Sequence, residues 1–185
     1  MPAATTHWTA DMVRALPDDG KRYEVVDGEL LVAPAPTWDH QRAIRELFLR
    51  LHPYITAHRL GQVIWAPADV TFSTTRMVEP DLFVVPLVSG REPRTWEEVG
   101  RLLLAVEVLS PSTARADRQV KRRLYQQENV PEYWIVDVDA RLIERWRPTD
   151  ARPEILTERL GWQPDAAYPP IEIALDEYFA EVCGE

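Results

Sequence analysis

Hydrophobic and polar residues follow two different periods along this chain, and the longer period predicts its helices. Apolar side chains recur every three to four residues over residues 38–57, as in a helix that buries one face. Residues 113–128 predict a more polar helix with a thin apolar stripe. Two short helices are predicted near the ends of the chain, at residues 9–15 and 176–182.

Runs rich in β-branched and aromatic residues predict the strands. Residues 23–32 hold an Asp27-Gly28 pair between two such runs, which is a strong signal for a hairpin. Residues 132–138 and 141–147 form a second candidate hairpin. The other predicted strands are residues 62–72, 81–85, 102–109 and, as an edge strand, 154–160. Because strands and helices interleave in this order, the sequence predicts a mixed α/β or α+β fold.

Composition narrows the class of protein. The chain has 185 residues, 45% apolar and 28% charged, which fits one ordinary globular domain over residues 1–185. No apolar run approaches the roughly 18–20 residues of a membrane span. Cys183 is the only cysteine, which excludes an internal disulfide and a metal-binding cysteine cluster and favours the cytoplasm. The net charge of −9 argues against a protein that coats nucleic acid, but it leaves room for a local basic patch.

One carboxylate stands within the apolar run 102–109, Leu-Leu-Leu-Ala-Val-Glu-Val-Leu. A run this apolar is typical of a strand that is buried on both faces, and a glutamate is rarely buried without a partner. Glu107 is therefore expected to have a cation nearby, either a metal ion or a Lys or Arg side chain. The alternative is a glutamate at the end of a strand that simply reaches solvent.

Asp81 begins another apolar strand. It follows Pro80, and a proline suits the start of a strand because it has no N–H to contribute to the sheet. Alone, an aspartate at this place is more typical of a turn. Together with Glu107, it would give two carboxylates on adjacent strands. Since Mg²⁺ is commonly held by one or two carboxylates plus water, the pair predicts a site for a hard divalent cation.

Lys121 is the third candidate. The chain has only two lysines, Lys21 and Lys121, and an ammonium group has a tunable pKa that a guanidinium lacks. The alternative is an i,i+4 ion pair with Asp117 on the surface of the predicted helix. Residues 115–123 carry five positive charges and one negative charge. This segment is predicted either to contact phosphates or to form a solvated helix face.

Several short motifs occur together in this chain. They are Tyr23-Glu24, Asp27-Gly28-Glu29-Leu30 and His40, then Pro80-Asp81, Glu107-Val108-Leu109-Ser110-Pro111-Ser112-Thr113, Asp117, Lys121 and Tyr125, and finally Val130-Pro131-Glu132-Tyr133-Trp134-Ile135-Val136-Asp137. In combination, over about residues 23–137, they resemble the Uma-type restriction endonucleases of the PD-(D/E)XK nuclease superfamily. The combined set is specific, whereas either the Pro-Asp pair or the Glu107 motif alone would be a weak signal.

The resemblance implies a restriction-endonuclease-like core in which helices flank a central mixed β-sheet. It also implies that Asp81 and Glu107 bind Mg²⁺ or Mn²⁺, with the carbonyl of Val108 as a third ligand. The superfamily pattern places a lysine two residues after the second acidic residue, and here that position is Leu109. Lys121 would replace it from the helix, with its ammonium folded back over Glu107.

The superfamily often adds one more acidic residue from its first helix. Glu24 and Glu29 are the candidates for that role here, although both lie on a predicted hairpin. His40 precedes the apolar face of its helix. It is expected either to make a structural hydrogen bond or to line the site.

The function expected from these residues is that of a metal-dependent endonuclease, a hydrolase that cleaves DNA phosphodiester bonds with Asp81, Glu107 and Lys121 as catalytic residues; RNA remains open as a substrate. Specificity would come from loops such as residues 86–98. A homodimer would suit double-strand cleavage, and edge strands at residues 141–147 or 154–160 could pair between chains. The alternative is a non-cleaving nucleic-acid-binding or interaction module on a nuclease fold, which the leucine at position 109 and the net charge favour.

Overall fold

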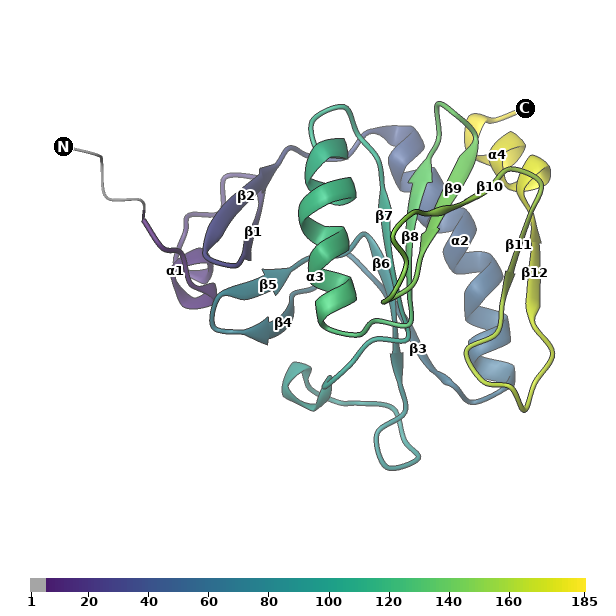
Figure 1. Ribbon diagram of the computed structural model, residues 1–185, viewed down its shortest axis with the longest axis horizontal. Helices are drawn as coiled ribbons and strands as arrows, with labels where there is room; N and C mark the ends of the chain where they lie inside the picture. Colours follow the sequence, from purple (N-terminus) through teal and green to yellow (C-terminus); the bar gives the residue numbers. More distant parts are fainter. Residues whose placement is uncertain (1–5) are drawn as a thin grey trace.

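The computed structural model describes residues 6–185, so the first five residues of the predicted domain lie outside the described part. Its centre is a six-stranded sheet in the order β10-β9-β8-β7-β6-β3 (Figure 1). Only β7 and β8 pair in parallel; the other neighbours are antiparallel, so the sheet is mixed as expected. The strands are β3 (Gly61–Trp65), β6 (Leu82–Pro86), β7 (Leu104–Val108), β8 (Glu132–Asp137), β9 (Leu142–Trp146) and β10 (Glu154–Leu156).

Two smaller sheets flank the central one. A four-stranded sheet in the order β2-β1-β5-β4 is built around the Asp27-Gly28 hairpin, whose two turn residues both have positive φ, 51° and 84°. A hairpin of β11 and β12 lies near the C-terminus. The strands are β1 (Arg22–Val26), β2 (Glu29–Ala33), β4 (Val70–Ser73), β5 (Arg76–Val78), β11 (Arg159–Trp162) and β12 (Ile171–Ala174).

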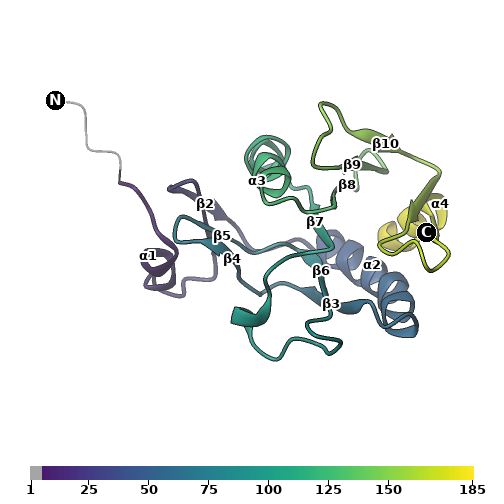
Figure 2. The same cartoon turned by 60° about the horizontal axis from the view of Figure 1, so that its bottom comes forward.

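Helices cover both faces of the central sheet. The long α2 (Trp38–Ala57) and the C-terminal α4 (Leu175–Cys183) pack on one face. On the other face lies a π-helix, Ala116–Lys121, that continues into α3 (Arg122–Gln127), in front of the sheet in Figure 1 and well separated from α2 in Figure 2. Within residues 6–185, no helix combines the length and the apolar character needed to cross a membrane. The short α1 (Ala10–Arg14) and a 3-10 helix, Trp96–Glu98, complete the fold.

The predicted long helix has the same bounds in the structure as in the sequence analysis, residues 38–57, and it continues through Pro53. Its N-cap is Thr37, whose hydroxyl accepts a hydrogen bond from the amide of His40 at 3.3 Å. The first helix is likewise capped, by Thr9. Local patterns and caps therefore suffice to define these helices.

Two predicted strands are wrong as single elements. Residues 62–72 contain most of β3 and most of β4, which belong to different sheets. Residues 154–160 similarly divide between β10 and β11. The prediction that residues 141–147 form an edge is also wrong, because β9 pairs with β8 on one side and with β10 on the other. In each case the local pattern shows β-propensity, but the partner strand is chosen by long-range packing.

Candidate active site

Glu107 lies in β7, a strand in which all five residues are buried. Its carboxylate is inaccessible to solvent, and Oε1 accepts hydrogen bonds from Lys121 Nζ at 3.0 Å and from Tyr125 Oη at 3.1 Å. The solvent-exposed alternative is therefore wrong, and the cation beside this glutamate is a lysine of the same chain. Tyr125 holds the carboxylate from one turn further along the helix.

Lys121 lies at the end of the π-helix, and its ammonium group contacts three acidic side chains. Nζ is 2.8 Å from Glu24 Oε2 and 3.6 Å from Asp117 Oδ1, in addition to its contact with Glu107. Burial alone would lower the pKa of Lys121, but the carboxylates of Glu107, Glu24 and Asp117 outweigh burial and raise it well above its ordinary value. The predicted i,i+4 pair with Asp117 exists, but it is the longest of the three contacts.

Asp81 directly precedes β6 and is also buried. Its Oδ2 accepts a hydrogen bond from the amide of Val108 at 2.8 Å and lies 3.0 Å from His40 Nε2, while Oδ1 is 2.5 Å from Arg22 Nη1. Burial opposes ionisation of this carboxyl group, but contact with His40 and the positive charge of Arg22 prevail and lower the pKa of Asp81 to about 2. Asp81 is thus a buried, ionised group rather than a simple turn residue.

The sheet register explains why these acidic residues meet. Leu82 of β6 pairs with Val106 of β7, so one further step along the two strands sets Asp81 opposite Glu107. The amide of Val108 faces Asp81, and the carbonyl of a strand residue points to the same side of the strand as its amide. The carboxylates of Asp81 and Glu107 and the carbonyl of Val108 thus lie at the same end of the β6–β7 pair.

Glu24 and Glu29, the two candidates for an additional acidic residue, have different positions. Glu24 is buried on β1; its Oε2 contacts Lys121, and its Oε1 accepts a hydrogen bond from the amide of Glu79 at 2.7 Å. Glu29 is exposed on β2 and lies outside the site. The sequence analysis missed Arg22, although the strand period of two places it on the same face of β1 as Glu24. That alternation is the signal that could have found it.

These residues form what we call the buried charge cluster: Glu24, Asp81, Glu107, Asp117 and Lys121, with Arg22 and His40 at its side. The cluster holds four carboxyl groups beside the ammonium of Lys121 and the guanidinium of Arg22. Burial, followed by the neighbouring carboxylates, raises the pKa of Glu107 well above its ordinary value against the opposing effect of Lys121, and burial also raises that of Asp117. The cluster is therefore short of positive charge.

A divalent cation fits this donor set. Among the described residues, no group of three or more His, Cys, Asp or Glu side chains is arranged to hold a metal ion. Mg²⁺ needs only one or two protein carboxylates, because water supplies the remaining ligands. Carboxyl groups outnumber the Lys and Arg side chains in the cluster, and the buried Oδ1 of Asp117 has no hydrogen-bond partner. Oxygen ligands and charge both suit Mg²⁺ or Mn²⁺.

The predicted basic segment at residues 115–123 is only partly available to a ligand. Besides the buried Lys121, Arg118 pairs with Glu144 at 2.6 Å and Asp137 at 3.0 Å. Arg122 lies over the ring of Trp146, 4.8 Å from its centroid. The exposed arginines of the segment are Arg115 and Arg123. The segment thus stabilises the fold with most of its charge.

The central mixed sheet, its flanking helices and the strand-borne acidic residues define a protein of the nuclease-like α+β class. The solved structure of "a putative nuclease belonging to DUF820" from Anabaena variabilis has the same fold, with a TM-score of 0.74, 16% identity, and coverage of 94% of this chain and 98% of that one. The Uma2 family model, described as "Putative restriction endonuclease", matches residues 10–176, and the chain belongs to this family. No curated protein matches the chain.

Proposed function

We propose that the protein is a divalent-cation-dependent endonuclease that hydrolyses DNA phosphodiester bonds at the buried charge cluster. The observation that carries the proposal is the contact of Lys121 Nζ with Glu107 Oε1, 3.0 Å, at the strand end where Asp81 also lies. The contact brings a lysine from the helix to the acidic residues, although the usual lysine position is Leu109. Membership of the Uma2 family supports the same class of activity.

Asp81, Glu107 and the carbonyl of Val108 would hold the cation. When bound, the cation would polarise a phosphoryl oxygen and lower the pKa of an adjacent water. Asp81 is oriented for this role by the amide of Val108 and by His40, and Glu107 is oriented by Tyr125. The ligands are therefore fixed before substrate arrives.

Lys121 would act on the attacking water and on the phosphorus. Its ammonium has three donors, of which two face Glu24 and Glu107. The third lies on the side of Asp117, 3.6 Å from its Oδ1 and without a hydrogen bond, and it would orient a water or neutralise charge on the phosphoryl oxygens. The water oxygen bonds to phosphorus as the bond to the sugar oxygen breaks, which leaves a phosphate monoester and a hydroxyl group. Glu24 would keep the ammonium in place during this exchange.

Substrate would reach the cluster through a small pocket beside it. This pocket, about 340 Å³, is lined by residues that include His40, Val108, Leu109, Ser110 and Arg118. His40 and Val108 also touch Asp81, so the pocket borders directly on a proposed cation ligand. Arg118, which lines this pocket, would contact a phosphate at its rim.

The test is cleavage of plasmid and linear DNA with Mg²⁺ or Mn²⁺, and of single-stranded RNA in parallel. The variants Asp81→Asn, Glu107→Gln and Lys121→Ala are each expected to lower the cleavage rate by about 10²-fold or more. Lys21→Ala, which removes the other lysine, should cleave at the wild-type rate. Circular dichroism would verify that each variant is folded, and unchanged cleavage in all three site variants would refute the assignment.

A specific observation favours the second candidate, a non-cleaving binding module. Asp81 is already paired with Arg22 and His40, and Glu107 with Lys121, as in a purely structural ion network. Titration with Mg²⁺ or Mn²⁺ discriminates the two, because a cation that binds the folded protein raises its melting temperature. No shift in melting temperature, together with retained binding of DNA, would establish the binding module.

A homodimer would bring two such sites to the two strands of a duplex. The free edges of the central sheet within the described residues are β3 and β10, and Ile155 of β10 is half exposed. Of the two edges predicted from sequence, only the one that contains β10 remains available. Sedimentation of the protein with and without Ile155→Lys tests this pairing, and a monomer in both samples would exclude it.

A further inference from the structure

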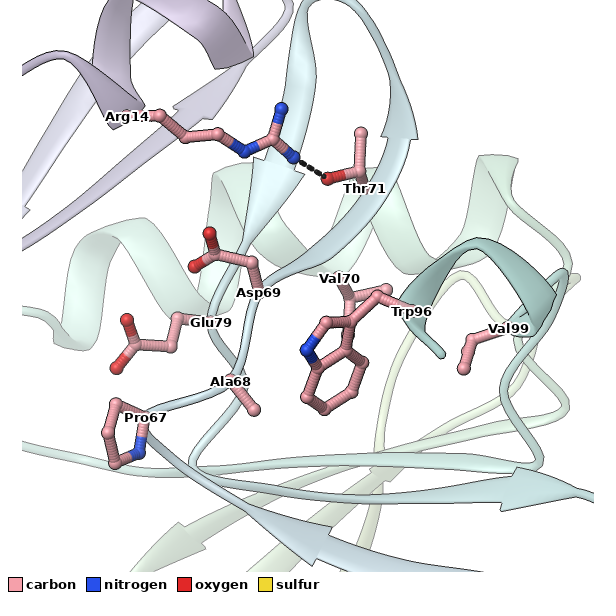
Figure 3. Close-up of a pocket in the computed structure, with 9 residues that line it drawn as sticks. All are labelled: Arg14, Pro67, Ala68, Asp69, Val70, Thr71, Glu79, Trp96 and Val99. Atoms are coloured by element: carbon pink, nitrogen blue, oxygen red, sulfur yellow. Dashed lines mark hydrogen bonds between the residues drawn. The ribbon is translucent and has the colours of Figure 1, made fainter. Parts of the chain in front are cut away.

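A second pocket lies beside the start of β4 and the 3-10 helix (Figure 3). It has a volume of about 700 Å³, within the range of pockets that hold small-molecule ligands. Its walls come from α1, from the start of β4, from the residue after β5 and from the segment around the 3-10 helix. It is distinct from the smaller pocket beside His40, with which it shares no lining residue.

One wall of this pocket presents carboxylates without donors. Asp69 and Glu79 are both half-buried, and among the described residues neither side chain has a hydrogen-bond or ion-pair partner. In Figure 3 both carboxylates lie on one side of the pocket, below Arg14, whose Nη2 donates to Thr71 Oγ1 at 2.8 Å. This wall is suited to a ligand that brings N–H donors.

The other wall is aromatic and apolar. Trp96, on the 3-10 helix, leaves half of its surface exposed and lies across the pocket from the carboxylates in Figure 3, near Val70 and Val99. Its ring makes a tilted contact with Phe83 of the core, with centroids 6.4 Å apart. The indole thus packs on the core through Phe83 and leaves part of its surface free, so a flat ring can stack on it.

The position of the pocket indicates which flat ring it takes. Glu79 is two residues before Asp81, and its amide donates to Glu24 of the buried charge cluster while its side chain lines the pocket. A ligand in the pocket would therefore lie beside the DNA bound for hydrolysis. A nucleobase turned out of its stack presents a face for the indole and, at right angles to the face, an edge with donors for the carboxylates.

We propose that this pocket binds an unpaired nucleobase that carries an exocyclic amino group, and guanine above all. Guanine presents its N1–H and N2–H₂ donors side by side, which matches a carboxylate, whereas thymine has no amino group. The base stacks on Trp96, and Asp69 and Glu79 accept its N–H donors. The pocket thus gives the enzyme a base preference near the cleavage site, an inference that rests on the proposed function.

The test uses uncharged nucleosides with the full chain in EDTA, so that neither a phosphate nor a metal is needed. Saturation-transfer NMR should show deoxyguanosine binding at least about tenfold tighter than thymidine. Trp96→Ala should weaken the binding of deoxyguanosine about tenfold through loss of stacking. Asp69→Asn should reduce the preference for deoxyguanosine over thymidine. The matched control is Trp65→Ala, since Trp65 is exposed to the same extent as Trp96 and lies on β3, outside this pocket.

Equal binding of the two nucleosides, or equal losses in Trp96→Ala and Trp65→Ala, would overturn the proposal. Because the assay involves no cleavage, its failure would leave the endonuclease proposal intact. Conversely, a protein that binds deoxyguanosine at Trp96 but does not cleave DNA would keep the pocket and refute the hydrolytic function. The two failures are therefore distinguishable.

Discussion

The two faces of the central sheet bury different chemistry. The face toward α2 and α4 buries an apolar core, whereas the face toward the π-helix and the four-stranded sheet buries a second apolar cluster together with the buried charge cluster. The contrast runs within single strands: Val106 and Val108 of β7 belong to the apolar core, while Glu107 between them faces Lys121. One strand thus serves both faces through its alternation.

The two faces differ in how much they contribute to the stability of the fold. Apolar burial stabilises at about 25 cal/mol per Å². Buried ion networks, in contrast, often contribute nothing beyond what apolar side chains of the same volume would, and they are strongly destabilised when one partner is lost. A chain that needed only a stable fold would have no reason to bury four carboxylates on one face. The charged face is therefore the one on which we expect function.

Removal of the Lys121 ammonium should destabilise the charged face more than any other change. Lys121→Ala would leave Glu24, Glu107 and Asp117 buried without their shared partner. The free energy of unfolding, measured by urea denaturation at pH 7, should fall by about 3–5 kcal/mol. Lys21→Ala, which loses only an exposed pair with Asp19, should leave it nearly unchanged. Equal effects of the two substitutions would mean that the buried contacts do not form.

A cavity in the apolar face should lower stability without altering the chemistry. Leu47→Ala removes a fully buried side chain of α2 and should cost about 2–5 kcal/mol. Leu49, two residues along the same helix, is half exposed, and Leu49→Ala serves as the matched control with little effect. The cleavage rate per folded molecule of Leu47→Ala should equal that of the wild type. A cleavage rate that falls as much as in Lys121→Ala would contradict the assignment of catalysis to the charged face alone.

A divalent cation should stabilise the charged face alone. At a concentration one hundred times the dissociation constant, Mg²⁺ or Mn²⁺ should add about 2.7 kcal/mol to the free energy of unfolding. Asp81→Asn should abolish this gain, whereas Leu47→Ala should retain it in full. Differential scanning fluorimetry with and without EDTA measures both. Stabilisation that persists in Asp81→Asn would place the cation elsewhere.

The smallest expected effect is a dependence of stability on pH at Asp69. Burial raises the pKa of this carboxyl group above its ordinary value of 3.8, so the folded state binds the proton more tightly than the unfolded state. The corresponding stability is fully present below about pH 3.8 and is lost as the pH rises through the raised pKa. Because Asp69 is half exposed, the loss should stay under about 1 kcal/mol. Asp69→Asn should lack it, while Asp18→Asn, on an exposed turn, should retain it; identical pH profiles for all three proteins would contradict the shift.

Local sequence patterns were enough for the elements that form by themselves and for the acidic residues with unusual neighbours. The helix of residues 38–57 and the Asp27-Gly28 hairpin follow from periodicity and turn chemistry. Glu107 stands out because an apolar strand surrounds it. The structure confirms that it is buried beside a cation, while the catalytic roles of Asp81, Glu107 and Lys121 remain predictions.

The remaining features depend on contacts between distant segments. Glu24 reaches Lys121 because β1 pairs with β5, 50 residues later in the chain, which brings the first hairpin over the helix. Arg22 and the assignment of β3 and β4 to different sheets depend on the same pairing. The paired residues lie far apart in the sequence, so local propensity and periodicity cannot predict these contacts.

The position of Lys121 depends on the number of residues in the π-helix. The amide of Arg122 donates to the carbonyl of Asp117, five residues back, so this turn contains one residue more than a regular helical turn. Each residue added to or deleted from a helix rotates everything beyond it by about 100°. A deletion that restored regular winding would move the side chains within the wide turn, where Lys121 lies, relative to Glu107, and a deletion that kept the wide turn would rotate the helix beyond it. Exposed positions such as Gln119 can therefore exchange side chains freely, but the segment cannot gain or lose a residue: insertions and deletions, rather than substitutions, are what this helix excludes.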